Sequence, residues 1–179
     1  VGLAEGTVSF VQDRLARANA LLIGPGLGSD PETLRTIRTI VRHTNIPLVL
    51  DADSLRAEIL SEVGSKPFIA TPHAGEFQRI APVLFSDGRF TAPHGVLVLK
   101  GPLTRVTDGR MIYHSPFGGP VLARGGSGDI LAGLIGGVLA QTPDDPVLAA
   151  CRGVVWQGHA ADLLARAHGQ RSQDTSQLL

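Results

Sequence analysis

The sequence has few of the residues that mark several large classes of protein. Its single cysteine, Cys151, cannot form a disulfide within the chain, so a domain held together by internal disulfides is excluded. Cys151 lies in an apolar, helical context, which favours a buried structural thiol and indicates a reducing compartment, the cytoplasm. No apolar run is long enough to span a membrane, and no basic-then-apolar leader opens the chain.

An excess of charge of either sign is also absent. The 16 basic and 16 acidic residues give a formal net charge of zero, which argues against a nucleic acid or an anionic membrane as the main partner. The arginines are scattered, and only Lys66 and Lys100 are lysines. We therefore expect the partner to be a small molecule.

Hydrophobic residues make up 43% of the 179 residues, which is enough to build the core of one α/β domain. We expect a single domain over residues 1–179, with a polar, frayed tail from about residue 169. The chain begins with Val1 and its only methionine is Met111. We therefore expect a processed or truncated form of a longer chain.

Short apolar runs alternate with helical patterns along the chain. Strands are expected at residues 20–23, 47–51, 68–71 and 95–100, and helices at 8–18, from Ser29 or Asp30 onward, and at 54–63, 73–81, 127–140 and 146–168. A loop broken by proline and glycine is expected at 82–94, and a hairpin at 104–113 that turns at Asp108-Gly109. This order predicts an α/β fold, with a mostly parallel central sheet flanked by helices on both faces.

Polar or glycine-rich segments follow four of the predicted strands. Ligands of open parallel sheets bind beyond the carboxyl ends of the strands, so these segments should meet at one edge. They are Gly24–Gly28, Asp51–Asp53, Thr71–Glu76 and Lys100–Thr104. The period of two along a strand puts Asp51 and Asp53 on the same face, where they either hold a metal-bound phosphate through water or cap the next helix.

A fifth segment, Gly125–Asp129, opens a helix that has no polar side chain from Ile130 to Ala140. Glycines leave backbone amides uncovered, and the helix N-terminus adds donors and positive potential, so this segment is expected to bind phosphate. The same potential favours ionised Asp129. A helix this apolar should be buried and hold Asp129 rigidly. The alternative is a glycine-rich turn with a capping aspartate.

Two common nucleotide-binding motifs do not fit. Gly24–Gly28 with Asp51 suggests a Rossmann fingerprint, but the third glycine has the wrong spacing and Pro25 intervenes. Neither lysine lies in a Walker P-loop. His73 and Glu76 share a helix face, but without an H-E-x-x-H pattern no zinc site is expected. Lys100 is either a solvated surface lysine or, beside a glycine, part of a nucleotide platform.

Five segments, in order, resemble the NAD(P)H-hydrate dehydratase family of ribokinase-like, carbohydrate-kinase-related enzymes. They are Gly24–Gly28, Asp51–Leu55, Thr71–Phe77, Val98–Gly101 and Gly125–Gly133, and the resemblance covers residues 20–165. It implies a ribokinase-like fold and a lyase of nicotinamide nucleotide repair. Such enzymes remove water from the S epimer of hydrated NADH or NADPH at the expense of ADP or ATP. The resemblance also implies Mg²⁺ and a homo-oligomer.

The resemblance assigns roles to individual residues. Asp129 matches the catalytic residue at the substrate hydroxyl. The nucleotide-binding positions match Lys100, Gly101, Pro102, Leu103, Thr104 and Gly128, and the expected phosphate site adds Gly125, Gly126 and Ser127. The substrate-contacting positions match Gly26, His73, Glu76 and Asp129. Glu76 also matches an acid linked to magnesium through water, although His73 replaces the asparagine of the ribokinase-like pattern.

The chain departs from the family pattern in two places. Family members begin with a glycine-rich strand and a helix that help to wall the nicotinamide pocket, and nothing before Val8 resembles them. Residues 82–95 are also short where the family usually has a full helix. Two alternatives stay open: a ribokinase-like kinase of a small alcohol or vitamin precursor, and a nucleotide-binding remnant without activity.

Overall fold

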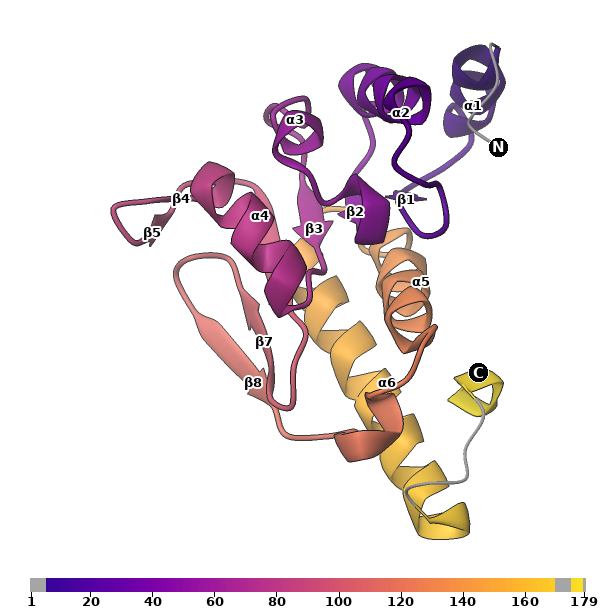
Figure 1. Cartoon of the computed structure of the whole chain (residues 1–179), viewed down its shortest axis with the longest axis vertical. Helices are drawn as coiled ribbons and strands as arrows, with labels where there is room; N and C mark the ends of the chain where they lie inside the picture. The colour runs from indigo at the N-terminus through magenta and orange to yellow at the C-terminus, as the bar shows by residue number, and fades with distance from the viewer. Residues whose placement is uncertain (1–5, 170–174, 179) are drawn as a thin grey trace.

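The computed structural model describes residues 6–169 and 175–178, and within these ranges six strands form one sheet between two layers of helices (Figure 1). The strand order is β1-β2-β3-β6-β7-β8. The strands are β1 (Leu21–Ile23), β2 (Leu48–Leu50), β3 (Phe68–Ala70), β6 (Gly95–Leu99), β7 (Thr104–Thr107) and β8 (Ile112–Ser115). The first four run parallel, and β7 and β8 are antiparallel. The predicted mostly parallel sheet is confirmed.

Helices cover both faces of this sheet, as the sequence predicts (Figure 1). One layer contains α1 (Thr7–Leu15), α2 (Pro31–His43), α3 (Ala57–Leu60) and α4 (Ala74–Leu84). The other contains α5 (Ser127–Leu139) and α6 (Pro146–His168). The described residues also form three 3₁₀ turns: η1 (Ala52–Ser54), η2 (Gly119–Leu122) and η3 (Thr175–Leu178). None of the helices in the described ranges is long and apolar enough to cross a membrane.

Alternate residues of the buried strands supply the two cores. Leu48 and Leu50 pack with Ile37 on the side of α2, whereas Val49 packs with Ile135 of α5 on the other side. All five side chains are fully buried, and each large apolar side chain contributes roughly 1.5–3 kcal/mol when removed from water. Because both faces are covered, the strands are continuous apolar runs rather than alternating ones.

Local signals fix the ends of the main helices. Asp30 caps α2 by accepting a hydrogen bond from the Thr33 amide at 3.0 Å, and Pro31 occupies the first turn, as predicted. The helices α5 and α6 pack closely because Gly153 has no side chain: an added Cβ would lie 2.5 Å from Ile135 Cγ1. The predicted helices at 127–140 and 146–168 are confirmed within one residue.

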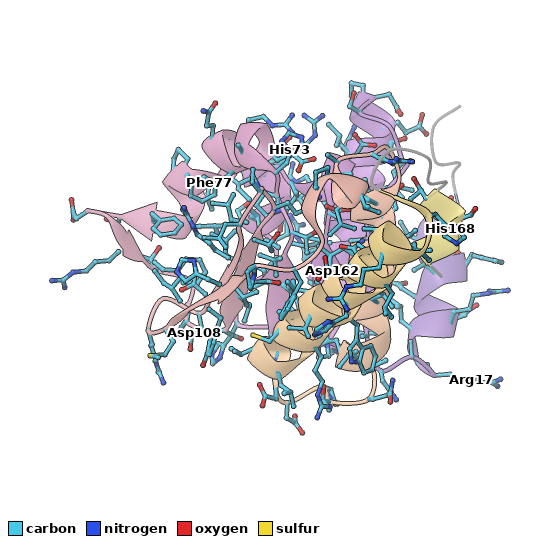
Figure 2. The ribbon with its side chains drawn as sticks, turned by 90° about the horizontal axis from the view of Figure 1, so that it is seen from below. Arg17, His73, Phe77, Asp108, Asp162 and His168 are labelled. Atoms are coloured by element: carbon cyan, nitrogen blue, oxygen red, sulfur yellow. The ribbon has the colours of Figure 1, made fainter. Side chains whose placement is uncertain are left out.

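Three expected elements differ. The helix predicted at 54–63 is wrong, because η1 and the short α3 replace it. The hydroxyl of Ser54 donates to backbone carbonyls and so competes with helix formation. The hairpin pairs Thr107 with Ile112, so its loop has four residues rather than two. Asp108 stabilises that loop by accepting hydrogen bonds from the amides of Arg110 and Met111 (Figure 2).

The stretch expected as a loop at 82–94 is also more ordered than predicted. Helix α4 continues through Pro82 to Leu84, and a small hairpin follows, formed by β4 (Phe85–Ser86) and β5 (Arg89–Phe90). The ring of Phe85 makes edge-to-face contacts with the rings of Phe77 and Phe90, at centroid distances of 5.8 and 5.3 Å. These aromatic contacts anchor the hairpin to α4.

Burial predictions are wrong at three places. Helix α5 is exposed along one side, at Gly133 and Gly137, because the sheet and α6 cover only the other side. The expected frayed tail contains η3, in which Leu178 is buried, while residues 170–174 and 179 lie outside the described residues. Cys151 is only partly buried, and burial raises the pKa of its thiol.

Candidate functional site

The segment after β1 is tied to the segment after β2. Ser54 Oγ donates to the Ile23 carbonyl at 2.8 Å, and the Gly28 amide donates to Asp53 Oδ2 at 2.9 Å. Gly24 has a φ of 133°, and an added Cβ would lie 1.7 Å from the Asp51 carbonyl oxygen, so only glycine fits there. Gly26, a predicted substrate contact, is therefore held in a loop that packs against the end of β2.

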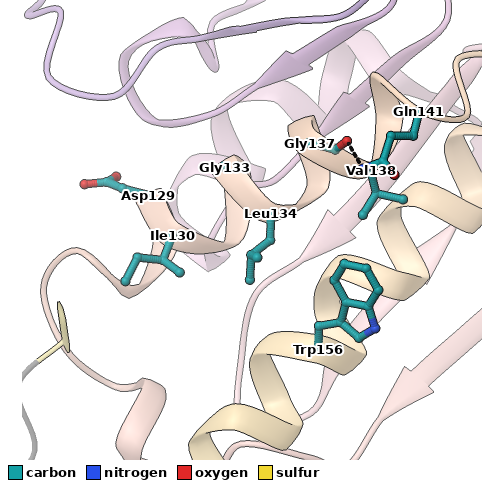
Figure 3. Close-up of a pocket in the computed structure, with 8 residues that line it drawn as sticks. All are labelled: Asp129, Ile130, Gly133, Leu134, Gly137, Val138, Gln141 and Trp156. Atoms are coloured by element: carbon teal, nitrogen blue, oxygen red, sulfur yellow. Dashed lines mark hydrogen bonds between the residues drawn. The ribbon is translucent and has the colours of Figure 1, made fainter. Parts of the chain in front are cut away.

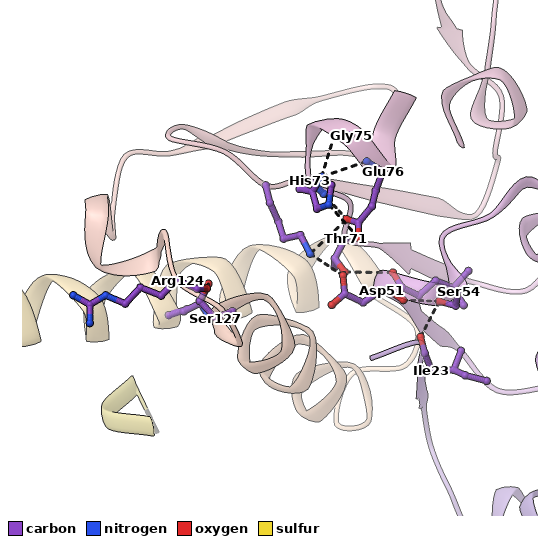
Figure 4. Close-up of polar contacts among 12 residues, drawn as sticks. Ile23, Asp51, Ser54, Thr71, His73, Gly75, Glu76, Arg124 and Ser127 are labelled. Atoms are coloured by element: carbon purple, nitrogen blue, oxygen red, sulfur yellow. Dashed lines mark hydrogen bonds and ion pairs between the residues drawn. The ribbon is translucent and has the colours of Figure 1, made fainter. Parts of the chain in front are cut away.

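Asp51 and Asp53 have separate roles, so the expectation that they share a face is wrong. The chain leaves the strand conformation directly after Asp51, and Ala52 has a φ of 48°. Asp53 then turns toward the Gly24–Gly28 loop. Asp51 is 1% exposed, and its Oδ1 accepts hydrogen bonds from Thr71 Oγ1 and Lys100 Nζ, both at 2.8 Å (Figure 4).

This contact also settles the interpretation of Lys100. Its side chain is 20% exposed, and its ammonium group turns toward the sheet edge, so a solvated surface lysine is wrong. The Lys100 amide donates to the Pro72 carbonyl at 2.8 Å. The ends of β2, β3 and β6 are thus joined through Asp51, Thr71 and Lys100. Sequence reasoning left Asp51 undecided and missed the role of Thr71, whose only signal is its place at the end of β3.

His73 and Glu76 form a reciprocal cap at the start of α4 (Figure 4). His73 Nδ1 accepts from the amides of Gly75 and Glu76, so it carries no proton. Glu76 Oε2 accepts from the His73 amide at 2.8 Å, and Oε1 lies 3.5 Å from His73 Nε2. Glu76 Oε2 also lies 3.9 Å from Lys100 Nζ. The predicted shared face of His73 and Glu76 is confirmed, and His73 lines the same pocket as Lys100.

The glycine-rich start of α5 presents bare backbone amides. Gly126 caps the helix with a φ of 84°. The amides of Gly125, Gly126 and Gly128 have no acceptor among the described residues. Ser127 differs, because its hydroxyl donates to the carbonyls of Leu122 and Arg124, at 2.7 and 2.9 Å, and so closes the turn. The donors available to an anion are therefore mainly backbone groups.

Of these glycines, Gly128 lies beside Lys100. An added Cβ on Gly128 would be 3.2 Å from Lys100 Nζ. Both residues line a pocket of about 760 Å³. Other predicted residues in its wall are His73, Gly101, Pro102, Thr104 and Ser127. The remaining predicted residues lie outside this lining: Gly26, Glu76, Leu103, Gly125, Gly126 and Asp129.

The far wall of the pocket consists of residues that sequence reasoning did not select. They include Phe117, Pro120, Leu122, Leu131 and Gln157. Gln157, on α6, is 4% exposed, and its Nε2 donates to the Ser127 carbonyl at 2.6 Å. The only sequence signal for Gln157 is a lone amide on an otherwise apolar part of that helix.

The loop that holds Phe117 is docked on α6. The Gly118 amide donates to Asp162 Oδ1 at 3.0 Å, and Figure 2 labels Asp162 on that helix. The ring of Phe117 lies 4.2 Å from the ring of His159, centroid to centroid. Gly158 allows this close approach, because an added Cβ there would lie 2.5 Å from Phe117 Cβ. The aromatic wall of the pocket is therefore fixed by the helix beneath it.

Asp129 lies on the same turn as the bare amides but lines a different hollow. Its side chain is exposed at one end of a groove of about 500 Å³ along α5, and Trp156 of α6 lies further along that groove (Figure 3). In Figure 3 the carboxylate points away from Trp156. Since Gly128 and Asp129 are consecutive, the pocket and the carboxylate flank one turn of helix.

Metal-binding side chains are sparse in this region. Within residues 6–169 and 175–178, no group of three His, Cys, Asp or Glu side chains is arranged to hold a metal ion. Glu76 is 6% exposed, with Lys100 and His73 beside its oxygens. These residues fit a magnesium ion that is bound directly by the phosphates of a nucleotide. Glu76 would then contact the ion through water.

Comparisons with known proteins agree with this geometry. A bifunctional NAD(P)H-hydrate repair enzyme Nnr of Moorella thermoacetica is 36% identical over 99% of this chain, which covers 36% of that protein. An ADP-dependent (S)-NAD(P)H-hydrate dehydratase of Cenarchaeum symbiosum is 31% identical over 82% of this chain and 55% of its own length. The crystal structure of the ADP/ATP-dependent NAD(P)H-hydrate dehydratase of Bacillus subtilis, co-crystallised with ATP/Mg²⁺, has a TM-score of 0.71 and 27% identity. That alignment covers 92% of this chain and 65% of the other.

The chain spans about a third of the length of the bifunctional relatives it matches, with shares of 36%, 32% and 34%. The likeness to the Bacillus subtilis structure establishes the ribokinase-like fold that the sequence predicts. The family model for carbohydrate-kinase-type proteins, described as NAD(P)H-hydrate dehydratase, matches residues 4–179 of this chain. The chain therefore belongs to the NAD(P)H-hydrate dehydratase family.

Proposed function

We propose that this chain carries the nucleotide-binding and catalytic core of an ADP- or ATP-dependent dehydratase that converts S-NAD(P)H hydrate back to NAD(P)H. The observation that carries the proposal is the meeting of Lys100 with Gly128, in the first turn of α5, at the wall of one pocket. Amides at a helix N-terminus and a lysine are what a terminal phosphate requires. Family membership supports the choice of substrate.

The shape of the pocket supports a nucleotide rather than a free phosphate. Its volume of about 760 Å³ falls within the roughly 300–1,000 Å³ of typical ligand pockets. Its lining contains polar groups, at Lys100 and Gly128, and apolar side chains, at Phe117 and Pro120. We assign the polar groups and the Lys100–Thr104 segment to the phosphates and ribose, and the apolar side chains to the base.

Asp129 is the proposed base. The hydroxyl oxygen of the hydrated ring attacks the terminal phosphorus as Asp129 takes its proton, and the bond between that phosphorus and the bridging oxygen breaks. The bare amides and Lys100 stabilise the charge on the transferring group. The ring nitrogen then expels phosphate by breaking the C–O bond, and the neighbouring carbon loses a proton to restore the dihydronicotinamide.

The other predicted residues have supporting roles in this scheme. His73 lines the pocket with its Nε2, because its Nδ1 is committed to the cap of α4. Gly26 offers an open backbone surface to the substrate, since nothing lies within 4 Å of its Cβ position. A magnesium ion bound with the nucleotide would neutralise phosphate charge, and Glu76 is the residue that would hold it through water.

Product analysis tests the proposal. The purified chain is incubated with S-NADH hydrate and either ADP or ATP. The expected result is recovery of the dihydronicotinamide absorbance with one phosphate released per NADH formed. In a parallel incubation with a small alcohol or vitamin precursor in place of the hydrate, a stable phosphorylated alcohol would instead identify a kinase. Nucleotide binding without any product would identify a non-catalytic remnant, and either result overturns the dehydratase assignment.

A further inference from the structure

The ammonium group of Lys100 has a fixed partner at the sheet edge, and the roles proposed above leave that partner unexplained. We propose that Asp51 is a positioning residue, which sets where Lys100 places its charge beside the start of α5. What this charge does for catalysis rests on the proposed function. The placement itself is a property of the folded chain and can be measured without any substrate.

Asp51 is held rigidly from several directions. Its amide donates to the Ile23 carbonyl at 3.2 Å, and its own carbonyl accepts from the hydroxyl of Ser54 at 2.9 Å. The carboxylate is 1% exposed, and Thr71 Oγ1 donates to its Oδ1 at 2.8 Å. The acceptor offered to Lys100 therefore has a fixed position that depends on β1, β2 and β3 together.

Lys100 reaches this acceptor across a neighbouring strand. It follows β6, Asp51 follows β2, and β3 lies between these two strands in the sheet. The bond from Lys100 Nζ to Asp51 Oδ1 is 2.8 Å, whereas Glu76 Oε2 is 3.9 Å away and too distant for a direct hydrogen bond. An ammonium group has three N–H donors, so the contact with Asp51 leaves others for the space beside Gly128.

The physical effect of this arrangement is preorganisation. A free lysine side chain loses rotamer entropy when a phosphate orders it, and the contact with Asp51 removes much of that freedom before a nucleotide arrives. A buried carboxylate also requires a charged or hydrogen-bonding partner, so the Lys100 ammonium group stays in contact with Asp51. The negative charge of Asp51 partly offsets the attraction of Lys100 for phosphate. The benefit therefore lies in geometry during phosphoryl transfer rather than in the strength of nucleotide binding.

The first experiment observes Lys100 directly, because the chain has only two lysines. Lysine labelled with ¹³C gives two sets of ε-CH₂ signals, which a Lys66→Arg variant assigns. Lys66 is an internal reference: it contacts the carbonyls of Arg42 and Glu62 at 3.4 Å, far from Asp51 along the chain and with no contact to it. In Asp51→Asn we expect the Lys100 signal to shift and to relax as a mobile side chain, with the Lys66 signal unchanged.

The second experiment is a double-mutant cycle on turnover. We expect Asp51→Asn to lower kcat by about 10–100-fold, the scale of a misplaced catalytic group, with the ADP dissociation constant changed less than about 3-fold. In a Lys100→Met background the same change should lower kcat by less than about 2-fold, because Asp51 then has no charge to place. Asp30→Asn is the matched control, since asparagine caps α2 as well as aspartate does.

Thr71→Val keeps the test valid if the Asp51→Asn protein does not fold. It removes one hydrogen bond to the carboxylate and should release Lys100 to an intermediate degree in the relaxation measurement. An unchanged Lys100 signal in both variants overturns the proposal. The proposal is also overturned if Asp51→Asn lowers kcat by the same factor in the wild-type and Lys100→Met backgrounds. That result would mean that Asp51 acts independently of Lys100. If the wild-type chain shows no turnover, the dehydratase function fails while the relaxation data still decide the role of Asp51.

Discussion

Gln157 donates from Nε2 to the Ser127 carbonyl at 2.6 Å, and this bond ties the middle of α6 to the first turn of α5. A carbonyl oxygen can only accept, so the amide nitrogen of Gln157 must face Ser127. The next residue after Ser127 is Gly128, which has a bare amide and lies beside Lys100. The position of the proposed phosphate site therefore depends on Gln157 of α6, a helix that comes after α5 in the sequence.

Replacing Gln157 by leucine should weaken nucleotide binding. The Ser127 carbonyl would lose the donor of Gln157 in a partly buried position, which costs roughly 0.5–1.5 kcal/mol, and relaxation of the turn should lower ADP affinity by about 10-fold. Isothermal titration calorimetry measures the change. Gln141→Leu is the matched control, because Gln141 also donates to a carbonyl of α5, that of Gly137, but on the surface near its other end. Equal affinities in the two variants would contradict the role given to Gln157.

Asp129→Asn separates binding from chemistry. The carboxylate is exposed and lies outside the wall of the nucleotide pocket, so ADP affinity and the melting temperature should stay close to wild type. Turnover of S-NADH hydrate should fall by about 10²–10⁴-fold, the usual cost of losing a general base. Asp144→Asn, an exposed change in the loop between α5 and α6, is the control. Turnover near the wild-type rate in Asp129→Asn would remove the residue from the mechanism.

The grouping of the site could be predicted because it depends only on strand direction. Parallel strands present their carboxyl ends at one edge, so His73 and Lys100 had to come together once the strands were identified. The start of α2 was predictable for a similarly local reason, since Asp30 and Pro31 act within one turn. These signals do not depend on how the layers pack.

Contacts that depend on packing could not be predicted in this way. The bond between Asp51 and Lys100 joins residues 49 positions apart and requires the order β2-β3-β6, which the sequence pattern does not specify. The position of Asp129 depends on the rotation of α5 about its axis, and a helix without polar side chains has no amphipathic signal for that rotation. Ser54 was the first residue of the helix predicted at 54–63, and its hydroxyl instead donates to the carbonyl of Ile23, which is distant in sequence.

Two glycines of α5 should respond differently to alanine. Gly128→Ala places a Cβ 3.2 Å from Lys100 Nζ, and because Asp51 holds that ammonium group, nucleotide affinity should fall by several fold. Gly137→Ala meets nothing within 4 Å and gains helix propensity, so it should raise the free energy of unfolding by up to about 1 kcal/mol. Calorimetry and thermal unfolding check both variants. A Gly128→Ala protein with unchanged ADP affinity would place the phosphate elsewhere.

Glu62 should make the stability of the protein depend on pH in the acid range. Hydrogen bonds from Arg42 and then Arg38 lower the pKa of Glu62 from 4.5 to about 2. A carboxylate with a lowered pKa contributes stability that is complete above pH 4.5 and is lost as the pH falls toward about 2. Glu62→Gln should therefore lower Tm by about 1–3 °C near neutral pH, where the contribution is complete.

Thermal unfolding at a series of pH values should show the Tm difference between wild type and Glu62→Gln closing below pH 4.5. Salt at 1 M should narrow this difference at every pH by screening the arginines. Glu58→Gln, an exposed change on α3, should show no such pattern, and a gap independent of pH would mean that Glu62 acts through packing rather than charge.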